Sequence, residues 1–129
     1  MKNAKLSKAL SPNGLHIPEI AFRVSGFGSN EEVEVRPIQE SVVVLKAHMT
    51  ALELIGAVQS LHALSMELVE TLIRACGLCL DCDAGCPADA PDQLLRQGVS
   101  ADTLEALLEA GVCAKNLAAL TRSDRVVYG

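Results

Sequence analysis

The 129-residue sequence has no tryptophan, one tyrosine and only two phenylalanines. Proteins that bind single-stranded nucleic acid by stacking depend on several aromatic side chains, so this mode of recognition is not expected. The chain also lacks a run of about twenty apolar residues, which a membrane-spanning helix needs, and its first residues lack the apolar segment of a secretory signal. We therefore expect a cytoplasmic protein with no membrane segment.

Motifs of known catalytic sites are absent as well. The sequence contains no G-x-S-x-G turn and no glycine-rich phosphate loop, and no nucleophilic side chain has a base at a recognisable spacing. We therefore predict that the protein is not an enzyme. Half of its residues are hydrophobic, and at this length they allow one ordinary domain or two very small ones.

Charge is distributed unevenly along the chain, although the formal net charge is -5. Residues 1–48 hold six Lys or Arg and five Asp or Glu, a net charge of +1. Residues 49–129 hold five Lys or Arg and eleven Asp or Glu, a net charge of -6. Because DNA phosphates repel acidic surfaces, any DNA binding is expected in the first 48 residues, and the acidic remainder is expected to face solvent or a protein partner.

The first 48 residues predict short strands separated by turns. Asn and Gly tolerate positive φ and Pro ends strands, so these residue types mark where each element stops. The pieces are too short to bury a core within one chain. In chain order we expect a turn at Pro12-Asn13-Gly14, a strand at Leu15–Ile17, a helical turn at Glu19–Val24, a strand at Val33–Arg36 that Pro37 ends, and a strand at Ser41–Leu45.

The order of these elements resembles the AbrB/MazE/SpoVT swapped-hairpin superfamily of bacterial transcription regulators and antitoxins. The likeness lies in N-G-x-H-I-P, a short helical turn, G-F-G-x-x-x-x-V-E-V and V-V-V-L-K, and it covers about residues 5 to 47. It implies that a small N-terminal swapped-hairpin β-barrel forms between two chains. Together with the helical patterns of the remaining residues, this predicts an α+β fold with an α-helical C-terminal region, and domains at 1–48 and 49–129.

The resemblance also implies a homodimeric, DNA-binding transcription regulator. Lys and Arg neutralise phosphates, and a dimer doubles each contact. One alternative is an antitoxin-like protein that binds a protein partner through its acidic helical part. Another is that the scattered basic residues only keep the surface soluble. The candidate DNA-contacting residues are Lys5, Lys8, Asn13, His16, Arg23, Arg36 and Lys46.

Residues 51–75 predict a long helix. Thr50 and Glu53 form the capping-box pattern T-x-x-E at its start, and Leu, Ile and Val recur after it at helical spacing. The apolar face is broad, so it has to be buried against another element. We expect that element to be the N-terminal strands, the helices that follow, or the same helix of a second chain.

Four cysteines form the run C-x2-C-x2-C-x3-C-P between Cys76 and Pro87. This spacing matches the iron–sulfur run of bacterial ferredoxins, whereas structural zinc sites usually separate two Cys pairs by a longer spacer. An iron–sulfur cluster is therefore favoured over zinc. The predicted ligands are Cys76, Cys79, Cys82 and Cys86, with the distant Cys113 as an alternative fourth ligand.

Other interpretations of the cysteine run remain open. Reversible disulfide formation requires exposed thiols with a low pKa. Thiols without any cofactor, packed as small apolar side chains, are the third interpretation. When both parts of the chain are considered together, they predict a regulator whose DNA binding responds to a metal, a cluster or the redox state of the thiols. The alternative is a small electron-transfer or metal-storage protein without a DNA role.

A short internal repeat follows the cysteine run. LLRQGVSADTLEA at residues 94–106 is followed at once by LLEAGVCAKNLAA at residues 107–119, with seven of thirteen positions identical. Each copy predicts a helix end at a glycine, Gly98 or Gly111, and then a new helix, with Ser100 as a helix N-cap. We expect short helices whose Leu and Val side chains cover the long helix.

Overall fold

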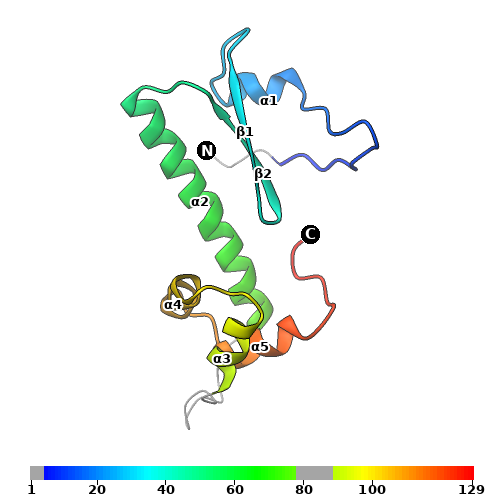
Figure 1. Cartoon of the computed structure of the whole chain (residues 1–129), viewed down its shortest axis with the longest axis vertical. Helices are drawn as coiled ribbons and strands as arrows, with labels where there is room; N and C mark the ends of the chain where they lie inside the picture. Colours follow the sequence, from blue (N-terminus) through cyan, green and yellow to red (C-terminus); the bar gives the residue numbers. More distant parts are fainter. Residues whose placement is uncertain (1–4, 78–88) are drawn as a thin grey trace. The chain divides into compact units, whose positions relative to one another are not determined.

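The computed structural model describes residues 5–77 and 89–129. The chain divides into two compact units, the hairpin unit Met1–Gln59 and the helical unit Ser60–Gly129, and the boundary between them falls inside one long helix. The predicted combination of a small sheet with helices is confirmed, but the described residues of this single chain close no barrel. The elements are α1 (Glu19–Val24), β1 (Val33–Ile38), β2 (Ser41–Lys46), α2 (Ala51–Cys76), α3 (Asp89–Arg96), α4 (Ala101–Glu109) and α5 (Ala114–Thr121) (Figure 1).

β1 and β2 form an antiparallel hairpin in which Val33 lies opposite Lys46. A two-residue loop joins the strands, and its second residue, Glu40, has a positive φ of 59°. β1 continues through Pro37, so the prediction that Pro37 ends the strand was wrong. Each strand of a two-stranded sheet has one side without a partner strand. At a position where the backbone N–H would point to that side, a proline removes no hydrogen bond between the strands.

The segment before the hairpin follows the prediction in two of its three elements. The turn at Pro12-Asn13-Gly14 is confirmed, because the Gly14 N–H donates to the Ser11 carbonyl at 3.0 Å. The helical turn after Pro18 is confirmed as α1. The strand predicted at Leu15–Ile17 was wrong for this chain, in which β1 and β2 pair only with each other among the described residues.

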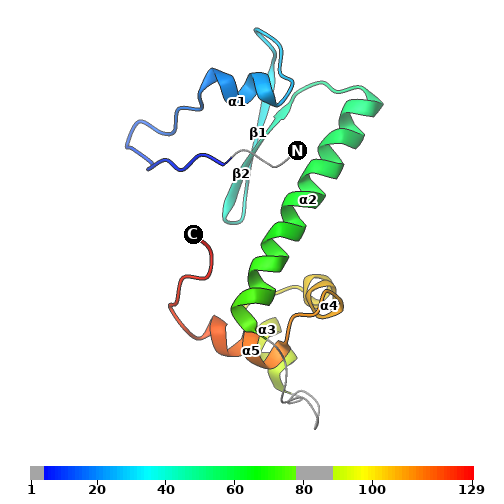
Figure 2. The ribbon, with the colours of Figure 1, turned by 180° about the vertical axis from the view of Figure 1, so that it is seen from behind.

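α2 begins with the predicted capping box and extends one residue beyond the predicted end, to Cys76 (Figure 2). The Glu53 N–H donates to the Thr50 hydroxyl at 3.2 Å, and the Thr50 N–H donates to the Glu53 carboxylate at 3.0 Å. By length and composition α2 is a helix that can cross a membrane. The expectation of no membrane segment therefore stays a prediction.

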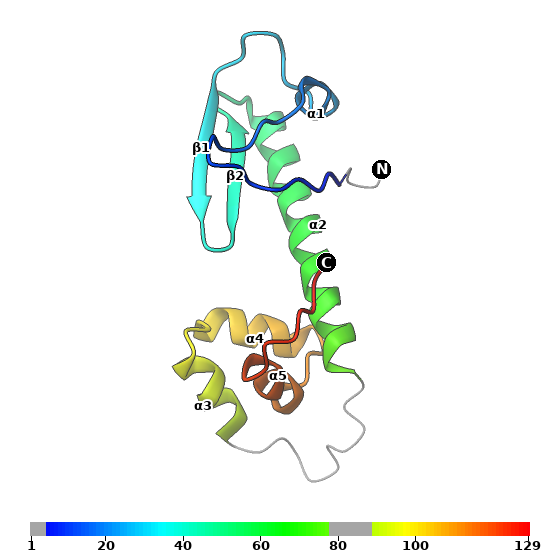
Figure 3. The same cartoon turned by 90° about the vertical axis from the view of Figure 1, so that its right-hand side faces the viewer.

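Buried side chains occur only in the second half of the described structure. Among residues 5–75, all of which the structure describes, none is buried. The core lies between α3, α4, α5 and the C-terminal end of α2 (Figure 3). It consists of Cys76, Ala90, Leu94, Leu104, Leu107, Val112, Ala114, Leu117 and Ala118, against which Val69, Leu72 and Ile73 of α2 pack. The repeat thus covers the end of α2, as predicted, and leaves the rest of its apolar face uncovered.

The two copies of the repeat end their helices in the same way. Gly98 and Gly111 have φ of 100° and 105°, a backbone conformation that strongly favours glycine. The Val99 N–H donates to the Leu94 carbonyl at 3.2 Å, which is the long hydrogen bond of a Schellman motif. Ser100 then caps α4, since its hydroxyl accepts from the Thr103 N–H at 3.2 Å. The predicted glycine ends and the Ser100 cap are confirmed.

Candidate nucleic-acid interface and cysteine site

The seven candidate DNA-contacting residues all belong to the unit Met1–Gln59. Six of them have exposed side chains, and His16 is among these, as its alternation with Leu15 and Ile17 predicted. Lys46 differs, because its side chain is only 16% exposed. The exposed candidates are Lys5, Lys8, Asn13, His16, Arg23 and Arg36.

Both arginines among the candidates are paired with a carboxylate. Arg23 contacts Glu19 at 2.8 Å, one helical turn earlier in α1. Arg36 contacts Glu34 at 2.8 Å along β1. Exposed ion pairs of this kind stabilise a folded protein by about 0–1 kcal/mol, so a DNA phosphate could replace the carboxylate with little loss of free energy. The pairs reduce the local positive charge without removing either arginine from the surface.

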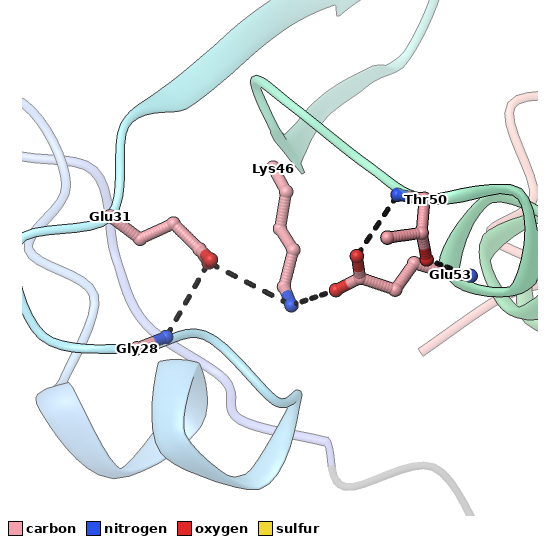
Figure 4. A network of polar contacts seen from close by, with 5 residues as sticks. All are labelled: Gly28, Glu31, Lys46, Thr50 and Glu53. Atoms are coloured by element: carbon pink, nitrogen blue, oxygen red, sulfur yellow. Dashed lines mark hydrogen bonds and ion pairs between the residues drawn. The ribbon is translucent and has the colours of Figure 1, made fainter.

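Lys46 joins three parts of its unit (Figure 4). At the end of β2, its ammonium lies 2.6 Å from the Glu53 carboxylate on α2 and 3.8 Å from the Glu31 carboxylate, and Glu31 in turn accepts from the Gly28 N–H at 3.4 Å. The hydrogen bond that Lys46 donates to the Glu53 carboxylate raises the pKa of Lys46 above its ordinary value of 10.5. In the single chain Lys46 therefore connects the hairpin, the glycine loop and the start of α2.

The Glu53 carboxylate carries the strongest electrostatic perturbation in this network. The hydrogen bond from Lys46, followed by those from Thr50, lowers the pKa of Glu53 from 4.5 to about 2. A lowered pKa stabilises the folded state above pH 4.5, and this stabilisation is lost as the pH falls toward about 2. The sequence predicted the cap between Thr50 and Glu53. It did not predict that the second oxygen of the Glu53 carboxylate pairs with Lys46, because no sequence pattern indicates that pairing.

Two cysteines from distant parts of the sequence meet in the core of the helical unit. Cys76 ends α2 and Cys113 precedes α5, and both are buried. The Asn116 side-chain amide donates to the Cys76 carbonyl at 2.9 Å, which ties the start of α5 to the end of α2. Burial, followed by the neighbouring Cys113, raises the pKa of the Cys76 thiol above 9.0. Cys113, the proposed alternative ligand, therefore lies near Cys76 in the described structure.

The other predicted ligands of the metal site, Cys79, Cys82 and Cys86, lie outside the described residues. Within residues 5–77 and 89–129, no group of three or more His, Cys, Asp or Glu side chains is arranged to hold a metal. The buried Cys76 thiol with its raised pKa has the opposite properties to an exposed, reactive thiol. For Cys76 alone, packing as a small apolar side chain fits the described surroundings.

The raised pKa of Cys76 leads to a pH-dependent stability. The folded protein keeps the proton on this thiol at pH values where the unfolded chain loses it, so the stabilisation is complete below pH 9.0 and decreases as the pH rises further. We expect Cys76→Ser to weaken the fall in the unfolding midpoint as the pH rises above about 9. Urea titrations at each pH measure it, and an unchanged fall in the variant would contradict the assignment.

Comparison of the chain with models of known protein families, with curated proteins and with solved structures finds no match in any of the three. The resemblance to swapped-hairpin regulators therefore rests on the sequence pattern alone.

Proposed function

We propose that the chain is a homodimeric DNA-binding transcription regulator whose N-terminal unit forms a swapped-hairpin barrel with a second copy. One observation carries this proposal: the turn, the short helix and the β-hairpin within residues 5–47 follow one another in the order that the resemblance implies, yet none of these residues is buried. A folded unit of this size without a core is not expected to be stable in water. Interleaving two copies would provide the missing core.

The segments of the hairpin unit support this arrangement. Leu15–Ile17 alternates like a strand but pairs with no strand in the described part of this chain. Val33 and Val35 of β1 are exposed, as is Val42 of β2. In a swapped dimer, the second copy would bring a strand to the first segment and cover the valines. Each exposed cation would also occur twice, which suits the two-fold symmetry of many DNA operators.

The experiment that tests the proposal is DNA binding by the purified full chain to a random-sequence DNA pool, across a range of salt concentrations. We expect a dimer by sedimentation and an association constant that falls steeply with salt, because Lys and Arg release counterions from phosphates. After rounds of selection, an enriched and symmetric sequence would identify a regulator. A chain that binds no DNA at low salt would refute the proposal.

A second function, sensing through the cysteines, is favoured by the position of Cys113 beside Cys76. A cluster or metal held by the Cys run would change the environment of these two buried thiols and hence the packing of α2 on α5. The test is the metal content and visible spectrum of anaerobically purified protein. Brown protein with iron and sulfide supports a cluster, and metal-free protein with unchanged DNA affinity on oxidation excludes this function.

A further inference from the structure

The first two thirds of α2 present an apolar surface that the described parts of the chain do not cover. Eight large apolar side chains of α2 are exposed, and none of them belongs to the core of the helical unit. Only the last turns of α2, from Val69 onward, pack against that core. The exposed side chains are Leu52, Leu54, Ile55, Val58, Leu61, Leu64, Met66 and Leu68.

Part of this surface has the spacing of a coiled coil. Positions 54, 58, 61, 65 and 68 are separated by alternating steps of four and three residues, and four of the five are Leu or Val. Such a heptad pattern places one narrow seam along a helix, which packs against an equivalent seam. We call these five positions the α2 seam. Leu54, Val58, Leu61 and Leu68 in it are each between 42% and 60% exposed.

The charges around the α2 seam favour a second copy of the same helix. From Leu54 to Met66 the sequence has no charged residue. Glu53, just before this stretch, is neutralised by Lys46 at 2.6 Å. Two copies of the seam therefore meet without like-charge repulsion, whereas a partner recognised by charge would find no complementary group there.

The same stretch is short for a lipid bilayer. Thirteen uncharged residues from Leu54 to Met66 form a helix of about 20 Å, whereas the hydrocarbon core is about 30 Å thick. Glu67 and Glu70 follow directly and would enter the membrane. Burial against protein satisfies the apolar face and leaves both carboxylates in water.

The extent of the apolar surface also fits a dimer. A stable interface takes about 20–30 residues from each partner. Residues 6–68 expose seventeen large apolar side chains, eight of them on α2. The exposed apolar side chains of residues 6–68 thus approach the number of residues that an interface between two copies needs, and nearly half of them lie on α2.

We propose that α2 associates with α2 of a second copy along the α2 seam. This inference goes beyond DNA binding, and it holds whether or not the hairpin contacts DNA. Ser65 is the polar member of the seam. A single polar residue in such a position sets the register of the two helices and lowers the stability of the pair.

The test is the dissociation constant of the full chain, measured by sedimentation equilibrium for wild type and three variants. Leu61→Glu places a charge in the seam, and we expect the dissociation constant to rise at least about tenfold. Ala63→Glu places the same charge on the opposite side of the helix and is the matched control, with an unchanged constant. Ser65→Leu replaces the polar member of the seam with an apolar one and should lower the dissociation constant several-fold. This variant tests the inference even if Leu61→Glu does not fold.

Three results would overturn the inference. They are a monomeric wild type, equal constants for Leu61→Glu and Ala63→Glu, and an unchanged constant in Ser65→Leu. Co-sedimentation of wild-type protein with phosphatidylcholine vesicles would assign the face to a membrane and also overturn it. Loss of DNA binding with these constants as expected would refute the proposed function alone, so the two proposals fail separately.

Discussion

Replacing Leu94 with alanine is expected to lower the free energy of unfolding of the helical unit by about 2–5 kcal/mol, the usual loss for a buried leucine. Leu94 on α3 has 0% of its surface exposed and lies in the middle of the core. The residue contacts side chains on every side, so the smaller alanine leaves a cavity. Because folded proteins are stable by only about 5–15 kcal/mol, much of the stability of this small unit depends on one side chain.

The neighbouring leucine provides the matched control. Leu95 is 42% exposed, so Leu95→Ala removes the same atoms at a position already in contact with water. We expect its loss to stay below about 1 kcal/mol. The second copy of the repeat offers the same comparison, with Leu107 at 8% and Leu108 at 40% exposed.

The measurement is urea unfolding followed by circular dichroism at one fixed protein concentration, because dimerisation also changes the apparent stability. Equal losses for Leu94→Ala and Leu95→Ala would contradict the described core. Equal losses for Leu94→Ala and Leu107→Ala would confirm that the two copies of the repeat bury the same position.

Features that depend on neighbours in the sequence were predicted correctly. The Thr50–Glu53 capping box, the turn at Asn13-Gly14 and the glycine ends of the repeat each involve residues a few positions apart. Their hydrogen bonds form within a single turn, and the residue types they require are few. The sequence therefore contains nearly all the information that determines them.

Of the features that depend on contacts between distant residues, the covering of α2 by the repeat was predicted, but the details of these contacts were not. The pattern did not reveal which leucine of each Leu-Leu pair is buried, since that depends on where α2 lies against the repeat. The strand expected at Leu15–Ile17 needs a partner strand, and none in the described part of this chain pairs with it. The Lys46–Glu53 pair likewise arises only when separate elements pack together. The sequence raised the proximity of Cys76 to Cys113 only as an alternative set of metal ligands.

The second large effect is expected on DNA affinity, from the two arginines of the hairpin unit. Arg23→Ala together with Arg36→Ala removes two exposed cations from each chain, hence four from a dimer. If all four contact phosphates, the slope of log K against log salt should become shallower by about 3–4. The association constant at low salt should fall in parallel, while the fold of the helical unit is unchanged.

Removing the paired carboxylates should have the opposite effect. Glu19→Gln and Glu34→Gln leave Arg23 and Arg36 in place but take away the negative charges 2.8 Å from each of them. The phosphate then no longer competes with a carboxylate, so the affinity at low salt should rise several-fold. An unchanged affinity in this variant would mean that these arginines do not face the DNA.

The control is a pair of arginines in the helical unit. Arg74→Ala with Arg96→Ala changes the net charge by the same amount, and both side chains are exposed. If this pair lowers DNA affinity as much as the hairpin pair, the effect follows net charge, and the hairpin is not the DNA-binding surface. If only the hairpin pair acts, the contacts belong to the unit Met1–Gln59. That unit contains six Lys or Arg and six Asp or Glu, a net charge of zero. Under the proposed function, its affinity for DNA would therefore depend on a second copy that doubles every exposed cation.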